Sequence, residues 1–90
     1  MIASSLVEHP GVFIADELEA REWTQRVLAF IMGRPEQTIS KIVSGRAGIT
    51  PTTAKELSAA FDISAEFFMS LQRAYDLAQE PDPLPSGELS

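Results

Sequence analysis

The stretch TQRVLAFIMGRPEQTISKIVSGR, residues 24–46, decides the fold because it reads as two short helices joined by a tight turn. Thr24 is a good N-cap for the first of these helices, which we predict to end at Met32. Gly33 follows and suits the left-handed backbone conformation that commonly terminates a helix. The composition of this stretch therefore predicts a helical hairpin with a defined turn.

The second predicted helix begins at Pro35, which fits a first helical position, and runs to Ser44 before Gly45 closes it. Its inward stripe would consist of Ile39, Ile42 and Val43. Its outer face and edges would be polar and carry Glu36, Gln37, Thr38, Ser40 and Lys41. This layout predicts a helix-turn-helix whose second helix enters the major groove of DNA. The alternative is an ordinary helical hairpin inside a small bundle.

The polar residues of this stretch suit different parts of a DNA duplex. We expect Gln37 to read a base, because its amide can pair with adenine N6 and N7. Gln25 lies at the start of the first helix, where its amide and the helix N–H groups can bind a phosphate. Lys41 and Arg46 suit the DNA backbone, with solvated surface charge as the alternative for each. The complete set of expected DNA-binding residues is Thr24, Gln25, Arg34, Glu36, Gln37, Thr38, Ser40, Lys41 and Arg46.

The charge is unevenly distributed along the chain. The whole chain carries −6, yet residues 24–46 hold four basic residues against one acidic residue, a net +3, which leaves −9 for the remainder. A basic patch on an acidic body can still dock on phosphates, although its non-specific affinity would be weak. The acidic surface could equally serve a basic protein partner.

Composition excludes several other classes of protein. The chain has 90 residues, 44% of them hydrophobic and 22% charged, which suits one small globular domain. It has no cysteine and one histidine, His9, and it lacks the HExxH, phosphate-loop and EF-hand patterns. We therefore predict no catalysis, no metal site and no cofactor. Without a signal-like start or a long apolar run, we expect a soluble cytoplasmic protein with no membrane partner.

The rest of the chain completes an all-α architecture of five helices. We expect a flexible lead-in over residues 1–8, a helix-turn-helix DNA-binding domain over 9–80 and a mobile tail over 81–90. In the first helix, Val12, Ala15 and Leu18 are predicted to face inward, with Ile14 and Trp23 as further candidates. A fourth helix, capped by Thr50, would bury Ala54, Leu57 and Phe61. A fifth helix, capped by Ser64, carries an apolar stripe of Phe67, Phe68, Leu71, Tyr75 and Ala78.

Several short patterns resemble HigA-type antitoxins of the Cro/C1-like helix-turn-helix group: HPG at 9–11, TQ at 24–25, TIS at 38–40, ITP at 49–51 and FF…LQ…YDL over 67–77. The resemblance covers residues 9–79. It implies a five-helix DNA-binding fold of the lambda-repressor type, a homodimer, and repression of the protein's own operon at an operator. It also implies a small basic RelE-like toxin that cleaves messenger RNA and is neutralised by complex formation.

The chain departs from the family pattern at two places. Pro35 and Glu36 occupy positions where the family often has serine followed by a basic residue, so the operator should differ from that of an arginine-bearing relative. Val27 and Phe30 occupy positions that are commonly polar, and two alternatives are open for them: a place in the core or an exposed apolar contact.

Two alternatives to an antitoxin remain open. One is a stand-alone or phage-derived transcriptional repressor without a toxin. The other is a protein-interaction module that keeps a degenerate helix-turn-helix, an idea supported by the overall negative charge and the Val27/Phe30 pair. If a toxin exists, its contact could lie on the first helix with its acidic residues, on the N-terminal lead-in or on the proline-rich tail.

Overall fold

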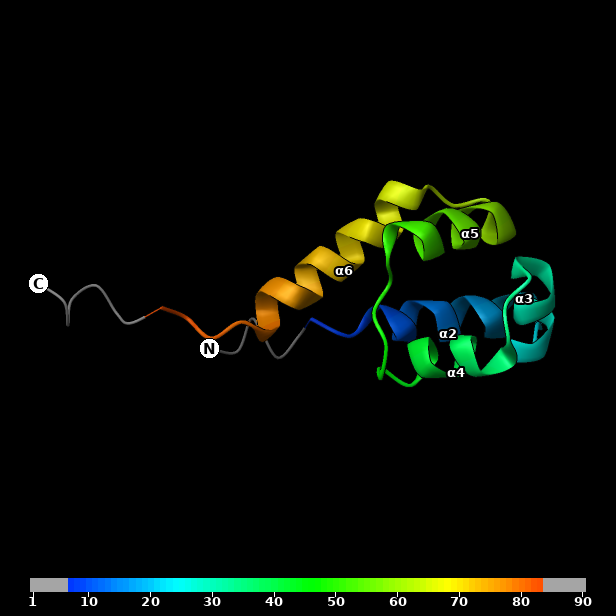
Figure 1. Ribbon diagram of the computed structural model, residues 1–90, viewed down its shortest axis with the longest axis horizontal. Helices are drawn as coiled ribbons and strands as arrows, with labels where there is room; N and C mark the ends of the chain where they lie inside the picture. Colours follow the sequence, from blue (N-terminus) through cyan, green and yellow to red (C-terminus); the bar gives the residue numbers. More distant parts are fainter. Residues whose placement is uncertain (1–6, 84–90) are drawn as a thin grey trace, which may run out of the picture.

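The computed structural model describes residues 7–83, which form five helices and no strand (Figure 1). The helices are α2 (Pro10–Arg21), α3 (Gln25–Met32), α4 (Glu36–Val43), α5 (Pro51–Phe61) and α6 (Ala65–Gln79). This arrangement confirms the predicted all-α architecture of five helices. Most of the expected lead-in and tail, residues 1–6 and 84–90, lies outside the described residues. No helix within 7–83 has both the length and the apolar character needed to cross a membrane.

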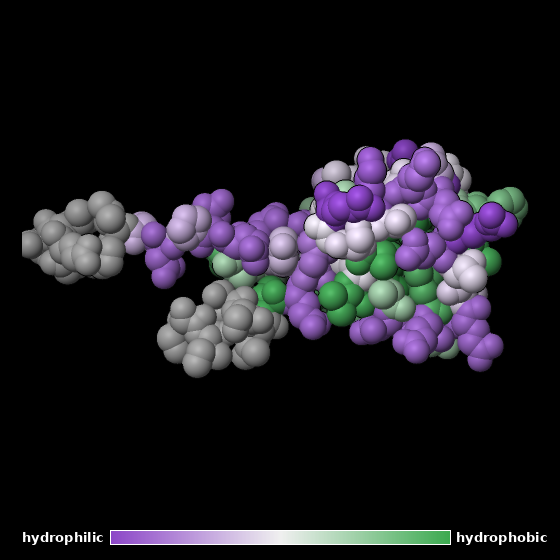
Figure 2. Space-filling view, turned by 90° about the horizontal axis from the view of Figure 1, so that it is seen from below, coloured by the Kyte–Doolittle hydropathy of each residue, from purple (hydrophilic) through white to green (hydrophobic). Residues whose placement is uncertain are grey.

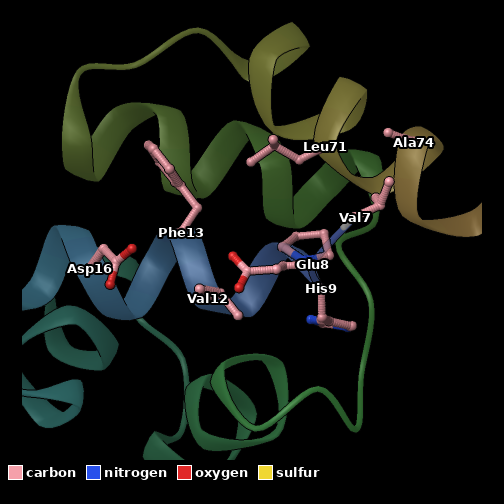
Figure 3. A pocket seen from close by; sticks show the side chains of 9 residues that line it. Val7, Glu8, His9, Val12, Phe13, Asp16, Leu71 and Ala74 are labelled. Carbon is pink, nitrogen blue, oxygen red and sulfur yellow. The ribbon is translucent and has the colours of Figure 1, made fainter. Parts of the chain in front are cut away.

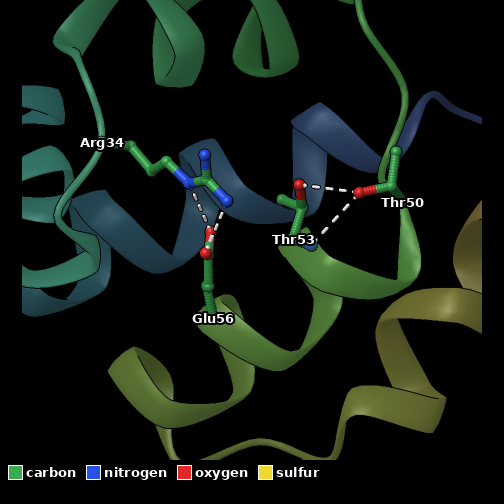
Figure 4. Close-up of polar contacts among 4 residues, drawn as sticks. All are labelled: Arg34, Thr50, Thr53 and Glu56. Carbon is green, nitrogen blue, oxygen red and sulfur yellow. Dashed lines mark hydrogen bonds and ion pairs between the residues drawn. The ribbon is translucent and has the colours of Figure 1, made fainter.

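Side-chain caps fix where three of the helices begin. Thr24, Thr50 and Ser64 each accept a hydrogen bond from the backbone N–H three residues ahead, over 3.1, 3.2 and 3.2 Å. The Thr50 hydroxyl also donates to Thr53 Oγ1 (Figure 4). Each cap satisfies an otherwise unpaired donor and is worth about 1 kcal/mol. These three predicted caps are confirmed.

The start of α2 is set by His9 and by a close backbone contact. His9 Nδ1 accepts a hydrogen bond from the Gly11 N–H over 2.9 Å, so the imidazole acts as the N-cap. A Cβ on Gly11 would lie 2.1 Å from the Ile42 carbonyl oxygen and 2.8 Å from that of Val43. Only glycine therefore allows the first turn of α2 to pack directly on the last turn of α4.

The core lies where the five helices meet. Every residue predicted to face inward from α5 is buried, as are Ile39 and Ile42 of α4. The core consists of Ile14, Leu18, Leu28, Ala29, Ile39, Ile42, Ile49, Ala54, Leu57, Phe61 and Phe68. Trp23, one of the further candidates for the core, stacks on Phe61 of α5 with ring centroids 5.7 Å apart.

The predicted face of α2 was wrong at Val12, and of the two alternatives for Val27 and Phe30 the structure has the exposed one. Val12 is 37% exposed, because the contact at Gly11 turns Gly11, Ile14 and Leu18 toward the core instead. Val27 and Phe30 are 39% and 87% exposed, not buried. The core-facing positions of α3 are Leu28 and Ala29, and these place Val27 and Phe30 on the outer side of a helix of only eight residues.

Fewer residues of α6 are buried than its apolar stripe predicted. Phe68 is fully buried, whereas Phe67 is 37% exposed. The second buried residue of this helix is Gln72, which the sequence did not reveal. Its Oε1 accepts a hydrogen bond from the Ile49 N–H over 2.6 Å, and its Nε2 donates to Asp76 over 2.8 Å. Gln72 thus fastens the loop after α4 to α6.

Candidate nucleic-acid interface

The turn between α3 and α4 has the left-handed backbone conformation that we predicted at Gly33. Gly33 has φ of 69° and its N–H bonds to carbonyl oxygens of the last turn of α3. The Arg34 N–H donates to the Ala29 carbonyl over 2.9 Å. These bonds satisfy the orphan carbonyls at the end of α3 and set the direction in which the chain leaves it.

The helix that follows is shorter than predicted by one residue at each end. Pro35 is the N-cap, with φ of −61° and ψ of 147°, rather than the first helical residue, and Ser44 is the C-cap. The extended ψ keeps Pro35 outside the helix although its φ would fit inside. α4 buries Ile39 and Ile42 as predicted. Its exposed residues are Glu36, Gln37 and Lys41, and Thr38 and Ser40 are half-buried at the edges.

Four of the expected DNA-binding side chains surround one surface hollow. The residues lining it are Gln25 from the start of α3 and Glu36, Gln37 and Ser40 from the outer face of α4. Two amides and a hydroxyl at one place offer both donors and acceptors, the groups that base edges and phosphate oxygens require. The hollow therefore joins the expected phosphate contact of α3 to the expected base-reading face of α4.

Hydrophobic side chains share this side of the molecule with the polar ones. Figure 2 views the protein from below, the side on which α4 lies in Figure 1, and shows hydrophobic residues gathered in the middle with polar residues around them. The surface is therefore mixed rather than uniformly polar.

The basic residues beyond the hollow lie in different surroundings. Lys41 is exposed, and Arg46 Nε donates to Ser44 Oγ over 3.1 Å at the end of α4. Glu36 lies 3.7 Å from Arg26 Nε in an exposed ion pair that the sequence did not predict. This pairing offsets part of the negative charge that Glu36 brings to the outer face.

Arg34, one of the expected DNA-binding residues, forms an ion pair with α5 that the sequence did not predict. Its Nε and Nη2 donate to the two carboxylate oxygens of Glu56 on α5, over 2.8 and 2.7 Å (Figure 4). These hydrogen bonds hold the pKa of Glu56 below its ordinary value and raise that of Arg34. The two residues are 22 positions apart, so no local spacing indicated the pair. A DNA phosphate would have to compete with Glu56 for this guanidinium.

Comparison with known proteins places the chain in a family. Residues 14–68 match the helix-turn-helix family model. Over 72 residues the chain is 35% identical to virulence-associated protein A' of Dichelobacter nodosus, covering 79% of this chain and 63% of that protein, which is less than two thirds of its length.

Two solved structures from Pseudomonas aeruginosa are similar in fold and sequence. PA4674 in complex with its operator DNA has a TM-score of 0.77 and 36% identity, covering 80% of each chain. The antitoxin HigA with the higBA promoter has a TM-score of 0.77 and 32% identity, covering 88% of this chain and 99% of that one. The chain therefore belongs to the helix-turn-helix family, in its Cro/C1-type group, and is similar in structure to HigA-family antitoxins.

Proposed function

We propose that this protein is the antitoxin of a type II toxin–antitoxin module. It binds operator DNA as a dimer, represses its own operon, and neutralises a RelE-like, mRNA-cleaving toxin by forming a complex with it. The observation that carries the DNA-binding part is the hollow that brings Gln25 together with Gln37 and Ser40. The similarity to PA4674 with its operator and to HigA with its promoter supports the same conclusion.

In this proposal α4 lies in the major groove and α3 crosses the DNA backbone. Gln37 pairs with an adenine, while Thr38 places its methyl group against a thymine or its hydroxyl on a phosphate. Gln25 binds a phosphate next to the free N–H groups at the start of α3. Lys41 and Arg46 bind backbone phosphates at the other end of α4 and add the salt-dependent part of the affinity.

A homodimer is part of the proposal because one recognition helix reads only a few base pairs. Two copies related by a twofold axis would read half-sites about 34–36 Å apart. The negative charge outside residues 24–46 would repel the duplex except where α4 faces it, which favours a single docking orientation. We assign this activity to residues 9–80, and a chain trimmed to them should retain its operator affinity.

Fluorescence anisotropy tests the DNA-binding part. The protein is titrated into labelled DNA from directly upstream of its gene and into scrambled DNA, each at low and moderate salt. We expect submicromolar, sequence-selective binding that weakens as salt rises. Equal and feeble binding to both DNAs would contradict the proposal. It would favour a protein-interaction module, the second candidate, to which the exposed Val27, Phe30 and Ile31 on α3 point.

A growth assay tests the toxin-neutralising part. The gene beside this one is expressed alone and together with the protein. A small basic product that arrests growth alone but not in the presence of this chain supports the antitoxin role. If no neighbouring product is toxic while operator binding holds, the protein is a stand-alone repressor.

A further inference from the structure

A groove between α2 and α6 is not used by the proposed DNA contacts. It has a volume of about 280 Å³, near the lower end of the ~300–1,000 Å³ typical of ligand pockets. Its apolar lining includes Val7, Val12, Phe13, Leu71 and Ala74. Figure 3 shows Phe13 of α2 and Leu71 of α6 pointing into the space between the two helices. The groove is therefore a surface on which one or two aliphatic side chains could be buried.

Acidic side chains border this apolar surface. Glu8 and Asp16 both belong to its lining and both are exposed, and no lysine or arginine of the described residues lines it. Figure 3 shows the Glu8 carboxylate near Val12 and the Asp16 carboxylate farther along α2. An apolar floor beside two carboxylates suits a segment that carries an aliphatic side chain flanked by lysine or arginine.

We propose that this groove is the docking site for a basic segment of the partner protein. The inference rests on the proposed antitoxin function and assigns its protein-binding surface to α2, α6 and residues 7–9. Glu8 and Asp16 steer and orient the basic segment, and the apolar floor supplies the contact area.

The charge of the groove also argues against a second copy as the occupant. A symmetric copy would bring its own Glu8 and Asp16 toward the same carboxylates, and among residues 7–83 neither a lysine nor an arginine lines the groove to separate them. Like charges placed together across an interface are strongly unfavourable. Because the lining contains no residue of α3 or α4, the basic partner and the operator can occupy the protein at the same time.

The probe is the purified product of the gene adjacent to this one, titrated by calorimetry into the full-length chain. Ala74→Trp fills the exposed end of the groove, and we expect it to weaken binding by about tenfold or more. Asp16→Lys should weaken binding and make the affinity less dependent on the salt concentration. Glu19→Lys makes the same charge change on an exposed position of α2 that does not line the groove, and it should change the affinity by less than about threefold.

Three results distinguish failure of the proposed function from failure of the proposed docking site. If the wild-type chain does not bind the neighbouring product, the toxin part of the proposed function fails and this inference fails with it. If the wild-type chain binds and Ala74→Trp, shown to be folded by its operator affinity, binds equally well, only the docking site is overturned. If Ala74→Trp instead turns a dimer into a monomer in sedimentation, the groove belongs to a second copy of the chain.

Discussion

The α3–α4 pair and the α2–α6 pair are held in one small domain by different interactions. α3 and α4 bury aliphatic side chains, and their one aromatic residue, Phe30, is 87% exposed. Between α2 and α6 the contact is aromatic, with the Phe13 ring 5.0 Å from Phe67 and 5.9 Å from Phe68. The outer polar side chains of α4 remain available for an outside partner, whereas α2 and α6 pack through aromatic rings and leave an apolar groove.

The largest contrast is expected between two phenylalanines. Phe68→Ala removes a fully buried ring and should lower the free energy of unfolding by about 3–5 kcal/mol. Phe30→Ala removes an exposed ring and should change it by less than about 0.5 kcal/mol. Urea denaturation of both variants measures the difference. Equal losses would show that Phe30 is packed and that the two helix pairs do not differ in this way.

Gly11 of α2 packs against the backbone of α4 and so joins the α2–α6 pair to the α3–α4 pair. A substitution at Gly11 should therefore destabilise the whole domain. Gly11→Ala places a Cβ against the Ile42 and Val43 carbonyl oxygens, which belong to the backbone and cannot move aside cheaply. We expect a loss of about 3 kcal/mol in thermal or urea unfolding. Glu19→Ala on the exposed side of α2 is the matched control and should lie within about 0.5 kcal/mol of wild type. A stabilised Gly11→Ala protein, the usual result at an open helical position, would exclude this backbone contact.

A smaller difference in unfolding free energy is expected between variants of two glutamines, the buried Gln72 of α6 and the exposed Gln37 of α4. Gln72→Leu leaves the Ile49 N–H without its acceptor and should cost about 2 kcal/mol of unfolding free energy. The Ile49 amide should also exchange with solvent faster. Gln37→Ala, on the exposed face of α4, should leave both quantities nearly unchanged. Slow Ile49 exchange in Gln72→Leu would mean that the loop is held by other contacts.

The smallest effect concerns the ion pair that links the α3–α4 turn to α5. Because Arg34 lowers the pKa of Glu56 in the folded state, the pair stabilises the fold at pH values above the ordinary glutamate value of about 4.5. This stabilisation is lost as the pH falls through the lowered pKa. Glu56→Gln should therefore melt below wild type at pH 7, and the two melting temperatures should converge in acid. A constant difference across this pH range would contradict the assignment to Glu56.

Much of the fold could be predicted because its signals are local. Thr24, Thr50 and Ser64 specify caps through residues three positions away, and α4 and α5 show a clear helical periodicity of buried residues. Which side of α2 faces the core could not be predicted, because it depends on the close contact between Gly11 and α4.

Parts of the fold and of the candidate site depend on contacts between distant segments and were missed for that reason. Glu56 captures Arg34 from 22 residues away, and Gln72 reaches Ile49 from 23 residues away. The gathering of Gln25 with the polar face of α4 agrees with the sequence pattern, but the role of each side chain on DNA remains a prediction.

The most direct test of the account is the affinity of wild type and Gln37→Ala for upstream and scrambled DNA, measured by anisotropy at one salt concentration. We predict that Gln37→Ala weakens binding to upstream DNA by about tenfold while binding to scrambled DNA stays the same. Gln79→Ala, an exposed glutamine at the end of α6, is the control and should change neither affinity. Unchanged affinity of Gln37→Ala for upstream DNA would contradict the assignment of α4 as the base-reading helix.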